Sequence, residues 1–571
     1  MLLALLENPG QVVTREELRE RLWTEGTFVE FDNGLNNAMH RLRSALGDTS
    51  GSPRLIETLP RVGYRFIGPV TRRAAEPAQS VSFRRRLVYA VVLVAALLAA
   101  GFLVYSMANR AGRIGSLAVL PFGSANATGA PGQPYLPKAV TEAVLLDLSA
   151  VRSVRVLPLS TVRRYAHEGE SLGEIARRLG VDAIASGSVE PVGETVRISV
   201  RLVRAAGGFP EWTGVFQESE SDFPELTREV SRGIVRAARL HLTAKEREAL
   251  SAAPEIDPQA YQDYLIGQYD MGQLTEAARK KALGYFEQTV AAAPDSALGY
   301  AGLADYYEYT DAVPPQIAMP RAKLYALKAL HIDEALASAH VTLGVAYFYG
   351  EWNWAASERE FRRALALNPG LGAAHRMYAA LLSCEGRVQD AIGQIRQAQQ
   401  LDPLSIPGDD MATVIWLDAQ QYGQSIREAD QLLVLSPTSV SGIEDVGTAD
   451  MFEGKFSDAV TEVERAVPEE GNDPYVSTLL GSAYARWGKV ALARQELREM
   501  KQVAERRYVP PFWFAMVYAS LGDKPQALNW LNQAHREHDS YMVFVKVTPW
   551  FDSLHNQPGF EQLLRKMNFP A

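Results

Sequence analysis

Residues 53–70 read PRLIETLPRVGYRFIGPV, and this stretch decides the fold of the N-terminal region. Apolar and polar side chains alternate over residues 54–58 and again over 64–67, which is typical of strands that bury one face. Residues 59–63, LPRVG, contain the proline and glycine of a turn. The stretch therefore predicts a β-hairpin.

Two helices are predicted before this hairpin. Residues 14–17 read TREE, a capping box with Thr14 as N-cap and Glu17 three positions later, and they predict a helix through residue 23. Either Asp32 or Asn33 is expected to cap a second helix over residues 34–46. Its apolar side chains recur at spacings of four, three and four, at Leu35, Met39, Leu42 and Leu46.

This order of helix, loop, helix and hairpin resembles the winged-helix domain of the OmpR/PhoB type, in its ToxR/CadC-like membrane version. The resemblance covers most of residues 1–70 and is carried by PGQVVTREELRERLW (9–23), GLNNAMHRLRSALGD (34–48) and the stretch at 53–70. It implies that the helix at 34–46 enters the major groove of double-stranded DNA, that the hairpin is the wing, and that the protein binds DNA as a homodimer on repeated half-sites.

The resemblance also assigns the candidate DNA-binding side chains. On the helix they are Asn36, Asn37, His40, Arg41 and Arg43, and on the hairpin they are Thr58, Arg61 and Tyr64. Arg pairs with guanine and Asn with adenine through two hydrogen bonds, and Arg also contacts phosphate. The alternative for Arg43 is a surface ion pair with Asp48 or Glu57, and the alternative for His40 is an exposed side chain without a role.

The N-terminal region departs from the family in one respect. The family begins with a small antiparallel sheet before its first helix, and Met1 falls where that helix would be. The apolar side chains that we expect to face the missing layer are Leu2, Leu3, Leu5 and Leu6. Either the start codon lies further upstream, or the domain is truncated. A receiver domain is also absent from the sequence, so we expect no phosphorelay.

Residues 87–107, LVYAVVLVAALLAAGFLVYSM, contain no charged side chain and are long enough for one transmembrane helix. Five Arg side chains lie shortly before this span, in the basic linker at 71–86, and only two follow it closely. The positive-inside rule then places residues 1–86 in the cytoplasm and residues 108–571 outside. We expect a single-pass protein of the bacterial inner membrane with a periplasmic C-terminus.

Residues 114–250 alternate between strand and helix patterns and predict an α/β domain. It resembles the TolB-amino-terminal or FlgO-like domain through LAVLPF (117–122), IARRLGVDAIASGSV (175–189) and VRISVRLVRAAGG (196–208). A long helix is expected over residues 222–242. Asp182 and Glu190 are interpreted as loop or surface charges and not as an acid/base pair.

Residues 257–540 predict helical repeats. Pro369, Pro403 and Pro437 lie 34 residues apart, and small side chains recur between them as in tetratricopeptide (TPR) repeats, with seven or eight units. Such a solenoid presents a groove to a protein or peptide partner. Trp352 and Trp354, in a turn between helices, are the best candidates for exposed aromatic side chains. Residues 541–571 are expected to cap the last repeat.

The fold class is therefore multi-domain and mainly α: a winged helix-turn-helix, one transmembrane helix, an α/β domain and an α-solenoid. Residues 1–113 carry a net charge of +5 in a chain of −9, which favours nucleic acid as the partner of this end. The one cysteine, Cys384, excludes an intramolecular disulfide. No motif indicates an enzyme, a cofactor or a metal site. We expect a membrane-anchored transcriptional regulator; the alternative is an envelope TPR scaffold with a vestigial DNA-binding domain.

Overall fold

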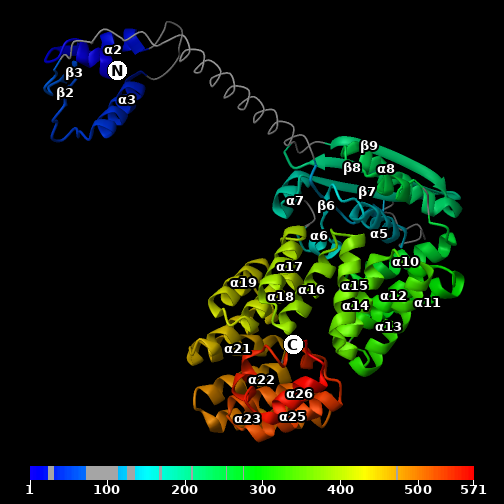
Figure 1. Ribbon diagram of the computed structural model, residues 1–571. Helices are drawn as coiled ribbons and strands as arrows, with labels where there is room; N and C mark the ends of the chain where they lie inside the picture. The colour runs from blue at the N-terminus through cyan, green and yellow to red at the C-terminus, as the bar shows by residue number, and fades with distance from the viewer. Residues whose placement is uncertain are drawn as a thin grey trace, which may run out of the picture. The chain divides into compact units, whose positions relative to one another are not determined.

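The computed structural model describes residues 1–22, 31–71, 114–124, 135–165, 170–206, 210–251, 254–273, 275–310, 312–470 and 473–570 (Figure 1). The chain divides into two compact units, Met1–Met107 and Ala108–Ala571. None of the helices in the described ranges has the length and apolarity needed to cross a bilayer. The predicted span at 87–107, and all of the linker except residue 71, lie outside those ranges.

The first unit contains three helices and a three-stranded antiparallel sheet. In chain order the elements are α1 (Leu2–Glu7), β1 (Val12–Thr14), α2 (Arg15–Leu22), α3 (Phe31–Leu46), β2 (Ile56–Leu59) and β3 (Gly63–Phe66). The strand order is β1-β3-β2, and the pairing of β2 with β3 confirms the predicted hairpin. Strand β1, which pairs with β3, was not predicted, because three residues are too few to show an alternating pattern. Gly63 is required beside β1, because a Cβ there would lie 2.1 Å from the carbonyl oxygen of Val13.

The capping residues predicted from the sequence are correct for α2 and wrong for α3. Thr14 Oγ1 accepts a hydrogen bond from the Glu17 amide at 3.2 Å, and Glu17 Oε2 accepts one from the Thr14 amide at 2.9 Å, which confirms the capping box. Helix α3 begins at Phe31, so the predicted cap at Asp32 or Asn33 is wrong. An acidic residue is favourable both as an N-cap and within the first turn, so its position alone does not locate a helix start.

The core of the first unit lies between the sheet and the three helices. It is made by Ala4, Leu5, Val13, Leu18, Leu35, Met39, Ile56, Tyr64 and Phe66. Leu5 is fully buried and Leu2 and Leu6 pack against the same core, whereas Leu3 is 79% exposed. The expectation that these leucines face a missing layer is therefore wrong for Leu5, whose burial stabilises the fold by roughly 1.5–3 kcal/mol.

The α/β domain of the second unit has one mixed sheet. Its strands are β4 (Ser116–Val119), β5 (Gly123–Ser124), β6 (Arg155–Val156), β7 (Ala183–Val192), β8 (Thr195–Arg204) and β9 (Pro210–Ser219). The order is β6-β4-β7-β8-β9 with β5 beside β7; β4 runs parallel to β6 and β7, and β7, β8 and β9 form an antiparallel meander. Asp182 accepts hydrogen bonds from Gly115 and Ser116, and Glu190 lies 3.8 Å from Arg197.

Helices cover both faces of this sheet. Apolar side chains of β8 pack with α5 (Leu136–Ser149) and α8 (Phe223–Ala237), and the opposite face packs against α6 (Leu159–Tyr165) and α7 (Leu172–Leu179). Ser171 and Glu174 form the capping box of α7, as the sequence indicates. The long helix expected over 222–242 is confirmed as α8, but it ends at Ala237 and not at 242, because Arg239 has a φ of 52°; a short helix, α9 (Ala244–Ala249), follows.

The described residues between 258 and 536 form eight helical hairpins, which confirms a TPR-like helical region. The pairs are α10 (Pro258–Met271) with α11 (Glu276–Ala292), α12 (Ala297–Tyr309) with α13 (Pro315–Ile332), α14 (Ala337–Val345) with α15 (Trp354–Leu367), α16 (Gly372–Glu385) with α17 (Val388–Leu401), α18 (Ile406–Asp418) with α19 (Tyr422–Leu435), α20 (Val440–Phe452) with α21 (Phe456–Glu470), α22 (Pro474–Arg486) with α23 (Val490–Ala504), and α24 (Pro511–Ser520) with α25 (Lys524–Arg536). Small residues allow the paired helices to approach: a Cβ at Gly344 would lie 2.6 Å from the ring of Phe361.

The C-terminal segment packs on the last repeat and also returns to the third and fourth. It contains η3 (Ser540–Phe544), η4 (Pro549–Leu554) and α26 (Pro558–Lys566). Phe551 contacts Phe512 of α24, as a cap would. Trp354 donates a hydrogen bond from Nε1 to the Met567 carbonyl oxygen at 2.9 Å, and its ring stacks on Phe569. Figure 1 shows α26, in red, beside α22 and α25.

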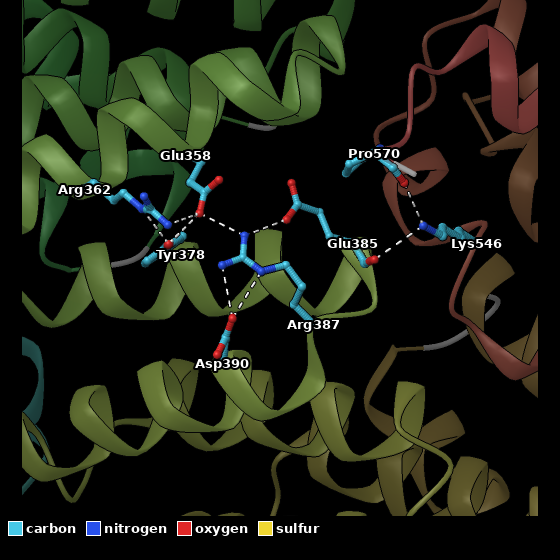
Figure 2. Close-up of polar contacts among 8 residues, drawn as sticks. All are labelled: Glu358, Arg362, Tyr378, Glu385, Arg387, Asp390, Lys546 and Pro570. Atoms are coloured by element: carbon cyan, nitrogen blue, oxygen red, sulfur yellow. Dashed lines mark hydrogen bonds and ion pairs between the residues drawn. The ribbon is translucent and has the colours of Figure 1, made fainter.

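This return corrects the prediction that Trp352 and Trp354 are exposed. Trp352 is 5% and Trp354 4% exposed, because residues 535–569 cover them. Figure 2 shows the polar contacts nearby, in which Lys546 Nζ donates to the carbonyl oxygens of Glu385 and Pro570. Arg387 pairs with the carboxylates of Glu358, Glu385 and Asp390 at 2.9–3.1 Å (Figure 2). The C-terminal segment is thus attached both to the third and fourth helical hairpins and to the last one.

Candidate DNA-binding surface

Helix α3 presents one face to the core and one to solvent. Leu35 and Met39 are 3% and 1% exposed and pack on the sheet. The opposite face carries a stripe at helical spacing that the described residues leave uncovered: Asn37, His40, Arg41 and Ser44. The structure therefore brings three predicted side chains together, and it adds Ser44, which sequence reasoning did not select.

Asn36 and Tyr64 form a polar link between α3 and the hairpin. The Tyr64 hydroxyl donates to Asn36 Oδ1 at 3.0 Å, and an Arg15 amino group donates to the same oxygen at 3.1 Å. Tyr64 is only 2% exposed, so the prediction that it contacts DNA from the wing is corrected. Asn36 itself is exposed, and its side-chain carbonyl is already occupied. Arg15, which the sequence analysis did not select, adjoins the surface at the first turn of α2.

Arg43 points into the domain and not toward DNA. It is 8% exposed, and its guanidinium donates to the Ile56 carbonyl oxygen at 2.9 Å and to Thr58 Oγ1 at 2.6 Å. The guanidinium is thus turned away from the exposed face on which the DNA contact was predicted. The alternative ion pair with Asp48 or Glu57 is also not found within the described residues, where Asp48 accepts backbone amides and Glu57 pairs with Arg65. Thr58 is half-buried and is engaged as the acceptor. Arg43 and Thr58 therefore attach the wing to α3.

Asp48 closes the loop between α3 and the hairpin. Its carboxylate accepts hydrogen bonds from the backbone amides of Arg54 at 2.7 Å, Leu55 at 3.2 Å and Ile56 at 2.8 Å. These bonds, that of Arg54 first, hold the pKa of Asp48 below its ordinary value of 3.8 although burial opposes them. The carboxylate thereby sets the position of β2 relative to α3.

The tip of the hairpin projects an arginine. Arg61 is exposed and has a φ of 63°, a conformation that is uncommon for residues other than glycine. In the described residues Arg41, Arg54 and Arg61 form no ion pair, whereas Arg21 pairs with Glu7 and Arg65 with Glu57. Unpaired guanidinium groups are available for phosphates, whose counterions are released on binding. Arg54, at the start of the hairpin, was also missed by the sequence analysis.

Comparisons with known proteins agree with this geometry. The family described as "Transcriptional regulatory protein, C terminal" matches residues 1–66. The cholera toxin homolog transcriptional activator of Vibrio parahaemolyticus is 39% identical over 82 residues, which are 14% of this chain and 28% of that protein. A putative adenylate cyclase of Rhizobium meliloti is 27% identical over 236 residues, 40% of each chain. The chain therefore spans less than half the length of either relative.

Among solved structures, a tetratricopeptide repeat protein from Parabacteroides merdae is similar at 12% identity, with a TM-score of 0.33 over 44% of this chain and 93% of that one. The assignment of the repeats rests instead on their own helical hairpins. Residues 1–66 form an OmpR/PhoB-type DNA-binding domain, which confirms the predicted resemblance for this part of the chain. The resemblance of residues 114–250 to a TolB-amino-terminal domain stays a prediction.

Proposed function

We propose that the chain is a membrane-anchored one-component transcriptional regulator. Its winged helix would bind promoter DNA in the cytoplasm as a homodimer, and its α/β and TPR-like domains would respond to a signal or protein partner in the periplasm. The single observation that carries the proposal is the uncovered stripe of Asn37, His40, Arg41 and Ser44, within a domain that matches a family of transcriptional regulators. The proposal assigns no catalytic activity to the chain.

The chemistry of the stripe supports sequence-specific recognition. Asn37 and Arg41 lie one helical turn apart on the exposed face, and their side chains are the usual partners of adenine and guanine. Arg54 and Arg61 are placed on the hairpin, where they would neutralise phosphates. Arg43, Thr58 and Tyr64 would act indirectly, because they hold α3 and the wing in one body.

Membrane anchoring is supported by the sequence of residues 87–107, which contain no charge, and by the excess of Arg before them. A signal on the periplasmic side would change the pairing of two chains and so the occupancy of the promoter. Fusions of a reporter enzyme after residue 86 and after residue 113 test this topology. An external position of residues 1–86 would contradict the proposal.

DNA binding is tested with the full chain in lipid nanodiscs. A library of DNA duplexes is selected at several salt concentrations, and the dissociation constants of selected and scrambled duplexes are compared. We expect a preference of at least about 10³-fold and a steep loss of affinity with salt. Arg41→Ala should weaken binding and relax the preference at one position, whereas Arg21→Ala, an arginine paired with Glu7 on the same domain, should not.

Binding without sequence preference at any salt concentration would overturn the proposal. That outcome, with Arg41→Ala equal to the parent chain, would favour the envelope scaffold, in which the repeats assemble protein complexes and the winged domain is vestigial.

A further inference from the structure

A cavity of about 580 Å³ lies in the second unit, where the α/β domain meets the repeats. One wall is formed by α5 and by residues 156–164. The other walls are formed by the ends of α10 and α12, by the start of α16, and by the loop that leads into α18. This volume is within the range of pockets that enclose a small molecule.

The two sides of the cavity are joined by a few polar contacts. Thr161 Oγ1 donates to Asp402 Oδ2 at 2.7 Å, the Arg152 guanidinium donates to the Leu367 carbonyl oxygen at 3.3 Å, and Lys138 pairs with Asp270 at 2.9 Å. A molecule in the cavity would touch both sides at once. Its binding would therefore change how firmly the α/β domain is attached to the repeats.

Two carboxylates that line the cavity, Glu142 and Asp305, form no ion pair within the described residues. In the described part of the chain Glu142 receives no hydrogen bond and forms no ion pair; Arg163, which influences it, lies over the ring of Tyr269 at 3.7 Å. Among the described residues, Asp305 accepts hydrogen bonds from the neutral side chains of Gln268 and Thr342 alone, both at 3.1 Å. Burial raises the pKa of Glu142 to about 7 and that of Asp305 to about 6.

One guanidinium in the cavity is also incompletely bonded. Arg376 lies 3.5 Å from the Tyr309 hydroxyl and 3.3 Å from the Met377 sulfur, and within the described residues it has no carboxylate at ion-pair distance. Glu308 interacts electrostatically with both Asp305 and Arg376, so the acidic and basic groups are near one another. Most of the five N–H donors of Arg376 are thus available.

The wall around these charges is largely apolar. It is made by Leu145, Leu146, Leu159, Met271, Leu371 and Ile406. An apolar surface with a few convergent polar groups is typical of a small-molecule site, since the surface supplies affinity and the polar groups fix the orientation.

We propose that this cavity binds a small zwitterion, in which an ammonium group and a carboxylate are carried on an apolar body, as in a free apolar amino acid or a dipeptide. The ammonium group meets Glu142 and Asp305, the carboxylate meets Arg376, and the apolar body lies on Leu145 and Leu371. Each charge of the ligand then forms an ion pair with a side chain that has none within the described residues. That the ligand is the signal rests on the proposed function; that the cavity binds it does not.

Calorimetry on the full chain in nanodiscs tests the proposal, with leucine and alanyl-leucine as probes. N-acetyl-leucine and leucinamide each lack one charge and should bind at least about 10-fold more weakly. Glu142→Gln and Arg376→Gln should each reduce the affinity for leucine by a similar factor. Glu190→Gln, a carboxylate on the solvent side of β7, should leave it unchanged. Asp305→Asn provides a second acidic variant if Glu142→Gln does not fold.

No measurable binding of either zwitterion would overturn the proposal, and so would equal binding of leucine, leucinamide and N-acetyl-leucine. DNA binding is measured on the same preparation without probe. Intact promoter binding with an empty cavity contradicts only this inference, whereas zwitterion binding without promoter recognition contradicts only the proposed function.

Discussion

The winged domain and the cavity between the α/β domain and the repeats both contain charged side chains that are removed from water. The two regions differ in the hydrogen-bond partners that these side chains have. Around α3, Arg43 has two acceptors and Asp48 has three backbone donors, all within the same small domain. In the cavity, Glu142 has no hydrogen bond from the described residues, and Asp305 has only neutral donors.

This difference separates two uses of buried charge. A charged group that bonds to groups of its own domain fixes the arrangement of these groups, and its removal leaves them unpaired. A charge left incomplete weakens the fold and is explained by what it binds. The variants below test this distinction, because loss of the first kind should destabilise the protein and loss of the second should not.

The largest effect is expected at Asp48. Because its folded pKa lies below 3.8, its contribution is present above its ordinary pKa and is lost as the pH falls through the folded value. Asp48→Ala should therefore destabilise residues 1–66 at pH 7 and differ less from the parent chain near pH 3. Hydrogen exchange of this domain in the full chain, read by mass spectrometry, measures it. Glu57→Ala, which removes a half-exposed ion pair, is the control; equal protection in both variants would contradict the prediction.

Arg43 and Arg41 form a matched pair on α3. Arg43→Met leaves the Ile56 carbonyl and the Thr58 hydroxyl without their donor, and it should cost about 2–3 kcal/mol of domain stability. Arg41→Met should change stability by less than about 0.5 kcal/mol. It should weaken DNA binding about 10-fold and reduce the salt slope by about one. If Arg41→Met lowered the stability and Arg43→Met weakened DNA binding, the face of α3 that carries Arg43 would be the one that contacts DNA.

The position of Arg43 could have been predicted from the sequence. It lies four residues after Met39 and three before Leu46, so helical spacing places it beside the buried face, while Arg41 lies on the opposite one. The residue type, and not the spacing, led to its assignment as a DNA contact. Capping boxes and the hairpin were predictable for the same local reason: their signals lie within a few residues.

The burial of Trp352 and Trp354 had no such signal. The groups that cover them lie near residues 535–569, about two hundred positions later, and nothing in the local turn indicates that partner. The cavity likewise combines α5, α12 and α16 from two domains. Periodicity predicts that helices pair, but it does not predict which distant segments meet across the curve of a solenoid.

The two tryptophans provide a smaller test of the same distinction. Trp354→Phe removes the hydrogen bond to the Met567 carbonyl and should cost about 1–2 kcal/mol, releasing the C-terminal segment. The indole N–H of Trp352 has no acceptor in the described residues, so Trp352→Phe, which keeps an aromatic ring beside His538, should be nearly neutral. Limited proteolysis of the last 30 residues compares the two variants. Faster cleavage of Trp352→Phe would contradict this account.

The smallest effect, and the one that decides the comparison, is expected at Glu142. Its folded pKa of about 7 exceeds the ordinary 4.5, so the charged form is penalised, and stability falls as the pH rises through this window. Glu142→Gln removes the penalty and should stabilise the second unit by at least about 1 kcal/mol at pH 8, by less at pH 5, and by nothing at pH 3, below the ordinary pKa. Tryptophan fluorescence during thermal unfolding follows this unit, since only Trp23 lies outside it. A variant that is less stable than the parent at pH 8 would show that Glu142, like Asp48, is a carboxylate that stabilises the fold. The charge of Glu142 would then no longer indicate a ligand in the cavity.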